Sequence, residues 1–239
     1  MRSSRSWRTA ELLLAGALGA CSTPAAIAPP AADNAVDVHA INEQYRDLKD
    51  VPSYVAKFER ESREIYARRV EIARAVGLRP GDRVADVGAG TGIFEPLFSL
   101  LVGPAGKVHA LDVAQPFVEH LERRAFVDAL ANVEVGRCPE DAIGLPDRSL
   151  DVVFLCDVYH HFERPERNLD SIRAALAASG RLVIVDFEKE AGRSSEFVMH
   201  HVRAPKATVR AEIERAGFAF EREERLLAEN FLLVFRKPR

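Results

Sequence analysis

The stretch from Val84 to Gly92 combines a short β-branched run, a carboxylate at Asp86 and a glycine-rich turn. Glycine recurs at alternate positions 88, 90 and 92, and the apolar stretch 93–102 follows directly. Glycine has no Cβ and tolerates positive φ, so such a turn lets the backbone approach a ligand closely. A strand, a glycine turn and a helix N-terminus form a site of the size that nucleotides occupy. The stretch therefore predicts a bound nucleotide-like cofactor.

The spacing of these glycines narrows the class of cofactor. A dinucleotide fingerprint has the form G-x-G-x-x-G, and its last glycine would stand at position 93, where the chain has Ile93. A second apolar run, 108–111, ends in Asp112, twenty residues after Gly92. A carboxylate accepts two hydroxyl hydrogen bonds well, so Asp112 suits a ribose.

The run from Asp86 to Gly92 resembles the first motif of the class I S-adenosylmethionine-dependent methyltransferases. The resemblance implies an α/β, doubly wound, mostly parallel seven-stranded sheet, the Rossmann-like methyltransferase fold, here with an N-terminal helical extension. It implies S-adenosyl-L-methionine as cofactor and Asp112 as the ribose ligand. The cofactor-binding residues expected from the first two strand ends are Asp86, Gly88, Ala89, Gly90, Gly92, Asp112 and Val113.

Two later strand ends complete the expected cofactor site. The family often has an acid after the third strand that bonds the adenine amino group; Asp141 fits this position best and Glu140 is the alternative. The same loop can also be read as merely polar. After the fourth strand, Asp157 is expected to face both cofactor and acceptor.

The segment Tyr159-His160-His161 holds the candidate catalytic groups. A histidine with a near-neutral pKa can take a proton from a hydroxyl, an amine or an acidic carbon as methyl is transferred. His160 or His161 is therefore the candidate general base, with Tyr159 as an alternative polar group. The competing interpretation is that these histidines pack or orient, while the enzyme works by aligning the nucleophile with the methyl group.

A metal site is not expected from the two His-His pairs, 160–161 and 200–201. Adjacent histidines diverge, and neither cysteines nor acids complete a ligand shell around them. Farther along, Arg203 and Lys206 could hold an acidic acceptor group or form a solvated basic edge.

Alternating strands and helices must position these residues. Strands are expected near 83–87, 107–111, 133–135, 151–155 and 181–186, and helices near 92–102, 115–130, 165–178 and 205–216. The segments 218–227 and 231–235 should pair as a terminal hairpin. Residues 39–50 read as irregular, and 52–76 as one long helix that either covers the cofactor mouth or packs on the sheet. Cys138 and Cys156 are expected to be free thiols.

The composition and net charge of the chain indicate which kinds of partner it can bind. The chain has 239 residues, 47% of them hydrophobic, and a formal net charge of −3. This suits one globular domain with appendages. Without a basic excess to neutralise phosphates, nucleic acid is not an expected partner. The expected partner is a small-molecule methyl acceptor.

The first residues form a separate segment. Arginines at 2, 5 and 8 precede the apolar stretch 12–20 and Cys21, an order that resembles a bacterial lipoprotein signal. The expected organisation is a signal peptide at 1–21, a Pro/Ala-rich tether and irregular segment at 22–51, and a methyltransferase domain at 52–239. The protein would then be exported and held to the membrane, on its periplasmic side, only by a lipidated Cys21. It would be cytoplasmic if the leader does not function.

The predicted activity is methyl transfer from S-adenosylmethionine to a small-molecule O, N or C nucleophile. The alternative is a non-catalytic protein on the same fold that binds or senses S-adenosylmethionine or S-adenosylhomocysteine. An exported location favours this alternative, because the cofactor is not obviously available there. The chain has neither G-x-S-x-G nor G-x-G-x-x-G, which argues against a hydrolase or a dinucleotide oxidoreductase.

Overall fold

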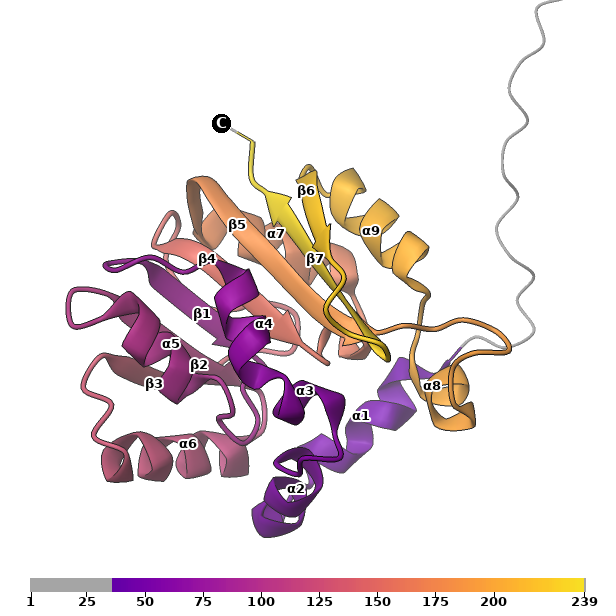
Figure 1. Cartoon of the computed structure of the whole chain (residues 1–239), viewed down its shortest axis with the longest axis horizontal. Coiled ribbons are helices and arrows are strands. Elements are labelled where there is room, and N and C mark those ends of the chain that lie inside the picture. The colour runs from indigo at the N-terminus through magenta and orange to yellow at the C-terminus, as the bar shows by residue number, and fades with distance from the viewer. Residues whose placement is uncertain (1–35, 239) are drawn as a thin grey trace, which may run out of the picture. The chain divides into compact units, whose positions relative to one another are not determined.

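The computed structural model describes residues 36–238 (Figure 1). The leader and Cys21 lie outside the described residues. Within these residues, no helix has the length and apolar character needed to cross a membrane.

A seven-stranded sheet forms the centre of the fold, in the order β3-β2-β1-β4-β5-β7-β6 (Figure 1). Only β7 runs against its neighbours, and the remaining pairs are parallel. The predicted mostly parallel sheet and its terminal hairpin are thus confirmed. The strands are β1 (Arg83–Val87), β2 (Lys107–Asp112), β3 (Val133–Arg137), β4 (Leu150–Cys156), β5 (Leu176–Phe187), β6 (Ala219–Glu224) and β7 (Asn230–Arg236).

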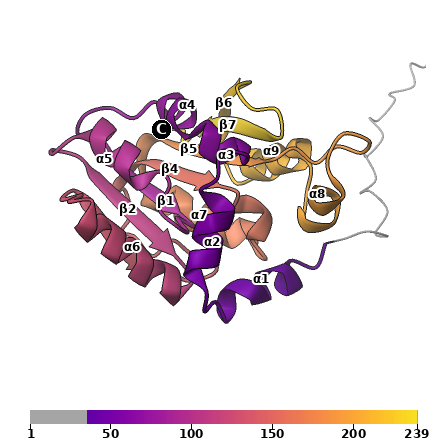
Figure 2. The ribbon, with the colours of Figure 1, turned by 60° about the horizontal axis from the view of Figure 1, so that its bottom comes forward.

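Side chains alternate between the two faces of every strand, and apolar ones lie on both faces. Helices therefore cover both faces of the sheet. Val84 packs on one face with residues of α4 (Arg69–Val76) and α5 (Glu95–Val102). Ala85 packs on the other face with residues of α7 (Pro165–Ala175) and α9 (Lys206–Arg215). Helix α6 (Gln115–Val127) lies beside α5, as the right-handed β1-α5-β2-α6-β3 path requires (Figure 2).

The chain before the sheet differs from the expectation. Residues expected to be irregular form α1 (Val38–Arg46), whose N-cap Asp37 accepts a hydrogen bond from the Ala40 amide at 3.2 Å. The expected single helix at 52–76 is divided into α2 (Val51–Phe58), α3 (Glu64–Ala67) and α4. The link between α2 and α3 is held by ion pairs from Glu59 and Arg63, so the chain turns there to reach the sheet.

The parallel strands bring their carboxyl ends to one edge. Asp86 on β1 stands opposite Ala110 on β2 and Phe154 on β4, so the ends of the three strands are level. The two cysteines near this edge, Cys138 and Cys156, are free thiols, as predicted.

Candidate functional site

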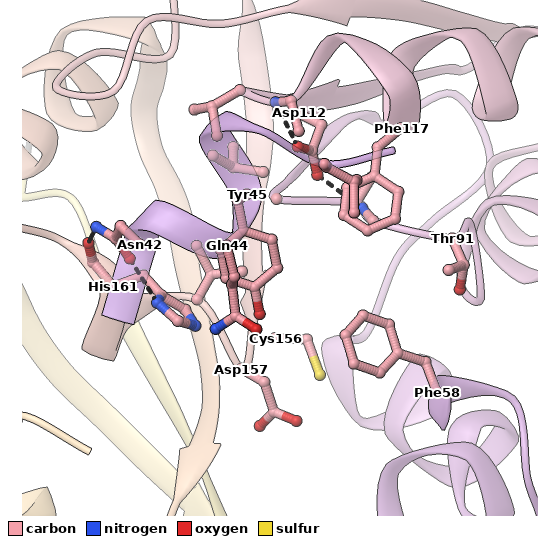
Figure 3. Close-up of a pocket in the computed structure, with 18 of the residues that line it drawn as sticks. Asn42, Gln44, Tyr45, Phe58, Thr91, Asp112, Phe117, Cys156, Asp157 and His161 are labelled. Carbon is pink, nitrogen blue, oxygen red and sulfur yellow. Dashed lines mark hydrogen bonds between the residues drawn. The ribbon is translucent and has the colours of Figure 1, made fainter. Parts of the chain in front are cut away.

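A cavity of about 1070 Å³ opens at the carboxyl ends of the strands (Figure 3). Such an edge is where open α/β sheets bind ligands. Its floor is made by the loops after β1, β2, β3 and β4. Its cover comes from α1 and α2, with Tyr45 of α1 and Phe58 of α2 reaching over it. The chain before the sheet therefore combines both expected roles: α1 and α2 cover the cavity, and α4 packs on the sheet.

The glycine loop bends back over the end of β2. The amides of Gly88 and Ala89 both donate to the carbonyl of Leu111, at 2.7 and 3.0 Å. Gly88 has φ +76°, and a Cβ there would lie 2.4 Å from Cγ2 of Val158. Gly88, Ala89 and Gly90 face the cavity. This close approach explains why the loop cannot carry side chains at its tightest point.

Gly92 has a different role from the one expected. It lies off the cavity wall with φ +85°, and a Cβ there would meet Leu121 of α6 at 3.0 Å. Its neighbour Thr91 faces the cavity instead. Gly92 thus permits close packing of the loop on α6.

Asp112 joins the ends of β1 and β2 (Figure 3). Its Oδ2 accepts from the Gly90 amide and its Oδ1 from the Ala114 amide, both at 2.9 Å. Burial raises the pKa of this carboxyl to about 6, against the backbone hydrogen bonds that lower it. Asp112 and Val113 both line the cavity. Each carboxylate oxygen has a further lone pair, so Asp112 can still accept hydroxyl groups from a ligand.

Asp86 forms a buried carboxyl pair with Glu95. Their side chains are 2% and 3% exposed. Burial, with the neighbouring carboxyl second, holds the pKa of Asp86 well above its usual range, and burial raises that of Glu95 to about 7. Burial therefore favours the protonated, uncharged form of both carboxyls.

Asp157 lies where β4 ends, in the left-handed region with φ +55°. Arg63, from the link before α3, forms an ion pair with it, and the Asn230 side-chain amide donates to Oδ1 at 2.8 Å. Burial raises the pKa of Asp157 against the attraction of Arg63. Asp157 faces the cavity together with Arg63 and Cys156 (Figure 3).

The loop after β3 places its two candidate acids differently. Asp141, the preferred position, lies off the cavity wall and pairs with Arg164 and Arg167 at 3.0 and 2.9 Å. Glu140 lines the cavity and pairs with Arg46 of α1 at 3.2 Å. The two arginines of the α7 start attract the Asp141 carboxylate away from the site, which leaves Glu140 on the wall.

His160 and His161, in the short helix η1 (Tyr159–His161), both face the cavity. His160 is 3% exposed, and its Nδ1 lies 2.7 Å from Oδ1 of Asp186 at the end of β5. Burial lowers the pKa of His160, but the Asp186 carboxylate more than offsets it, so the net pKa is raised. Burial, followed by the neighbouring histidines, lowers the pKa of His161 to about 2.

Tyr159 points away from the site, although the sequence makes it a candidate catalytic group. It is fully buried in the core between the sheet and α7 and α9, and its hydroxyl donates to Glu212 at 2.9 Å. Arg203 also pairs with Glu212, at 2.6 Å. Lys206 pairs with Glu188 and Glu223. Neither basic residue is therefore free to hold an acidic acceptor.

A third histidine lies close to the two of η1. His201, at the end of α8 (Glu196–His201), lies beside the η1 pair, and the three side chains bring a ring nitrogen each to within 4.8 Å of one another. The rings of His160 and His161 do not diverge, because their centroids are 4.1 Å apart. His200 is exposed and outside this group.

The sequence reasoning missed the residues that α1 and its neighbours bring to the site, namely Asn42, Tyr45, Arg46 and Arg63. A signal for α1 exists. Val38, Ile41, Tyr45 and Leu48 follow the spacing of an amphipathic helix, directly after the N-cap residue Asp37. No comparable signal marks Arg63, which reaches the site through the break between two helices.

Comparison with known proteins finds similarity to methyltransferases. A family model described as a methyltransferase domain matches residues 85–184. The C-methyltransferase UbiE of ubiquinone and menaquinone biosynthesis from Ectopseudomonas mendocina is 31% identical over 114 residues, which make up 47% of this chain and 44% of that protein. The chain thus covers less than half the length of the curated relatives that it matches.

Solved structures agree over more of the chain. An S-adenosylmethionine-dependent methyltransferase from Aquifex aeolicus has a TM-score of 0.70 and 28% identity, over 78% of this chain and 98% of that one. The 1,6-didemethyltoxoflavin-N1-methyltransferase of Burkholderia thailandensis, with bound 1,6-didemethyltoxoflavin and S-adenosylhomocysteine, has a TM-score of 0.62. It is 20% identical over 84% of this chain and 87% of its own, so its likeness concerns the fold.

Proposed function

We propose that this protein transfers a methyl group from S-adenosylmethionine to a small-molecule O, N or C nucleophile, because residues 85–184 match a methyltransferase domain and the chain resembles a solved methyltransferase in fold. The observation that carries the proposal is the joint geometry of the glycine loop and Asp112. The loop closes on the carbonyl of Leu111, and Asp112 accepts from the loop at Gly90 while facing the cavity.

The charges of the cavity fit this cofactor. Asp86 and Asp112 are buried carboxyls and Asp157 is a half-buried one, and all three face the cavity from three strand ends. S-adenosylmethionine carries its reactive methyl group on a cationic sulfonium and also has an ammonium group. Carboxylates attract such cations in a site of low dielectric, and they would repel the pyrophosphate of a dinucleotide.

Each strand end would hold one part of the cofactor. Asp112 would accept the ribose hydroxyls, and the backbone at Gly88–Gly90 would pass the amino-acid end, which the buried pair at Asp86 would attract. On the β3 side Glu140, rather than Asp141, is the acid available to the adenine. The cover of α1 and α2 would exclude water from the bound ligand.

The acceptor would lie at the other end of the cavity, between Phe187, Phe197 and the histidines. Aligning a nucleophile with the methyl group supplies much of the rate in such a reaction. The nucleophile is activated at the histidines, where the buried Nε2 of His160 offers a lone pair to a proton or to a metal ion. Tyr159 takes no part, because its hydroxyl is bonded to Glu212.

A calorimetric titration with S-adenosylhomocysteine, followed by S-adenosylmethionine, tests the cofactor assignment. We expect saturable binding with one site per chain. Absence of binding for both compounds would overturn the proposal. The competing sensor function predicts the same binding without turnover, so a transfer assay with radiolabelled methyl and a panel of small aromatic hydroxyl, amine and activated-carbon acceptors separates the two.

We also propose that Cys21 is lipidated and anchors an exported protein. The support is the order of arginines, apolar stretch, small residues and cysteine at the start of the sequence. Expression with labelled palmitate should label the wild type and not Cys21→Ser. Equal labelling of both would remove the proposal, and it would leave the methyl-transfer assignment untouched.

A further inference from the structure

Three histidines converge on one wall of the cavity. His160 and His161 come from η1, and His201 comes from α8, forty residues later in the chain. The ring centroid of His201 lies 5.2 Å from that of His160 and 5.3 Å from that of His161. One ring nitrogen from each residue lies within 4.8 Å of the other two. We call these three side chains the histidine cluster.

Neighbouring side chains fix which nitrogen of each η1 histidine is free. Asp186 accepts from Nδ1 of His160, and it is itself held by the amides of His160 and Phe187 at 3.0 and 2.8 Å. The remaining nitrogen of His160, Nε2, is buried and has no hydrogen-bond partner among residues 36–238. Leaving such a buried polar atom without a partner is unfavourable. A ligand at Nε2 would satisfy it.

Asn42 sets the proton position of His161 in the same way. Its Nδ2 donates to the carbonyl of His161 at 2.9 Å, so its Oδ1 is the atom that faces Nδ1 at 2.7 Å (Figure 3). Nδ1 of His161 therefore carries the hydrogen, and Nε2 carries the lone pair. An imidazole whose other nitrogen donates to an oxygen is the usual form of a metal ligand.

From this geometry we propose that His160, His161 and His201 bind a divalent transition-metal ion of the zinc class. Three imidazoles are a donor set that zinc accepts, and a site with three protein ligands keeps a fourth position open. That position would hold an anionic oxygen of the methyl acceptor. This last role rests on the proposed methyl transfer, whereas the metal site itself does not.

Closing the site needs only small movements. Ligand nitrogens around a tetrahedral zinc ion, about 2.0–2.1 Å from each, are separated by about 3.4 Å. The three ring nitrogens lie within 4.8 Å of one another, so they must move closer together to bind one ion. His201 is partly exposed and stands at the end of the six-residue α8, stacked on the exposed Phe197 at a centroid distance of 4.6 Å. Of the three ligands it is the one least constrained by packing.

The alternative is an aromatic cluster without an ion. Tyr45 meets the ring of His161 edge-on at 5.2 Å, and Phe197 stacks on His201, so packing accounts for part of the arrangement. Packing alone leaves Nε2 of His160 unsatisfied, and it does not need Asp186 and Asn42 to orient the two rings. The metal site accounts for both observations.

The test is a titration of the untagged full chain, previously stripped with a chelator, with Zn²⁺ by calorimetry and with Co²⁺ by visible absorption. We expect one ion per chain and ligand-field bands typical of four-coordinate Co²⁺. His201→Ala should weaken binding at least 100-fold, and Asp186→Asn by 10–100-fold, the usual range for such a supporting residue. His200→Ala, which changes the exposed neighbouring histidine, should bind as the wild type does.

Two results would overturn the proposal: no binding of either ion at micromolar concentration, or equal affinity of the wild type and His201→Ala. Binding of S-adenosylhomocysteine to the stripped protein is measured in parallel. If that binding persists without metal binding, only the metal site fails and Nε2 of His160 is a proton site. If the metal ion binds but S-adenosylhomocysteine does not, only the methyl-transfer assignment fails.

Discussion

Asn42 and His161 hold each other through two hydrogen bonds, one to the backbone and one to the ring. The Asn42 amide donates to the His161 carbonyl at 2.9 Å and accepts from the ring Nδ1 at 2.7 Å. These two bonds join α1 to the short helix η1, 119 residues away in the chain. They close the cover of the cavity and orient a candidate catalytic ring with the same side chain.

Replacing Asn42 with Ala should loosen α1 without unfolding the sheet. Two hydrogen bonds are worth about 1–2 kcal/mol together, so hydrogen exchange of the amides in 38–46 should become about tenfold faster or more. Affinity for S-adenosylhomocysteine should fall several-fold, because Tyr45 is carried by the same helix. Glu43→Ala, an exposed change on α1, is the matched control. Unchanged exchange in Asn42→Ala would show that other contacts hold the helix.

Gly88→Ala and Gly90→Ala should differ sharply in stability and in cofactor binding, although both positions have positive φ. An added Cβ at Gly88 meets Cγ2 of Val158 at 2.4 Å, whereas at Gly90 the nearest atom is 3.9 Å away. Gly90→Ala should cost about 1 kcal/mol of stability from backbone strain alone. Gly88→Ala should cost more and abolish cofactor binding, measured by chemical denaturation and calorimetry.

The double variant Gly88→Ala with Val158→Ala tests the cause. It removes both methyl groups that an added Cβ would strike, and leaves the Val158 Cβ at 3.3 Å. We expect it to recover part of the stability lost in Gly88→Ala, that is, a favourable coupling between the two sites. Additive losses would mean that strain, and not the clash, dominates at Gly88.

Asp112→Asn should weaken binding of S-adenosylhomocysteine by about 10–100-fold, since a hydrogen bond to a charged group contributes about 1.5–3 kcal/mol. Part of the loss would come from the loop, because Gly90 also donates to this carboxylate. Asp141→Asn provides the comparison: its carboxylate pairs with Arg164 and Arg167 off the cavity wall, so its affinity should stay within twofold of the wild type. A larger loss of affinity in Asp141→Asn would show that Asp141 contributes to the cofactor site.

The fold was predictable because its signals are local and repeat. Apolar runs that end in Asp86 and Asp112 mark strand ends, and parallel strands bring such ends to one edge. The choice between Glu140 and Asp141 had no such signal, because a loop lacks the fixed period that orients side chains in strands. It depends on Arg164 and Arg167, which only the folded chain brings near.

Prediction from the sequence also failed where residues far apart in the chain come together in the fold. His201 joins His160 only because β5 returns the chain to the same edge before α8, and no spacing in the sequence encodes that meeting. The helix α1 was missed for a different reason. Its apolar spacing is present but short, and the polar residues between the apolar positions favoured an irregular reading. Tyr45, with its ring in the middle of the cavity wall, was lost with it (Figure 3).

The buried pair Asp86–Glu95 should make stability fall as pH rises. Burial raises the pKa of Glu95 from 4.5 to about 7, and Asp86 shifts in the same direction. Between pH 4.5 and about 7, the folded protein keeps a proton that the unfolded chain has released. The free energy of unfolding therefore decreases as pH rises through this range. The loss is on the order of 3 kcal/mol, complete above the folded pKa. Arg124 limits the shift of Glu95, and Asp112 adds to that of Asp86.

Glu95→Gln should flatten this dependence, because an amide does not titrate and has nearly the same size and shape as the carboxyl that it replaces. Urea denaturation of both proteins between pH 5 and 8 gives two profiles whose difference isolates the pair. His161 and His201, whose pKa values are lowered by burial, act in the opposite direction at the acid end and cancel in the difference. Glu122→Gln, at an exposed position of α6, should leave the profile unchanged. If Glu95→Gln keeps the wild-type slope, the proton lies elsewhere than on this pair.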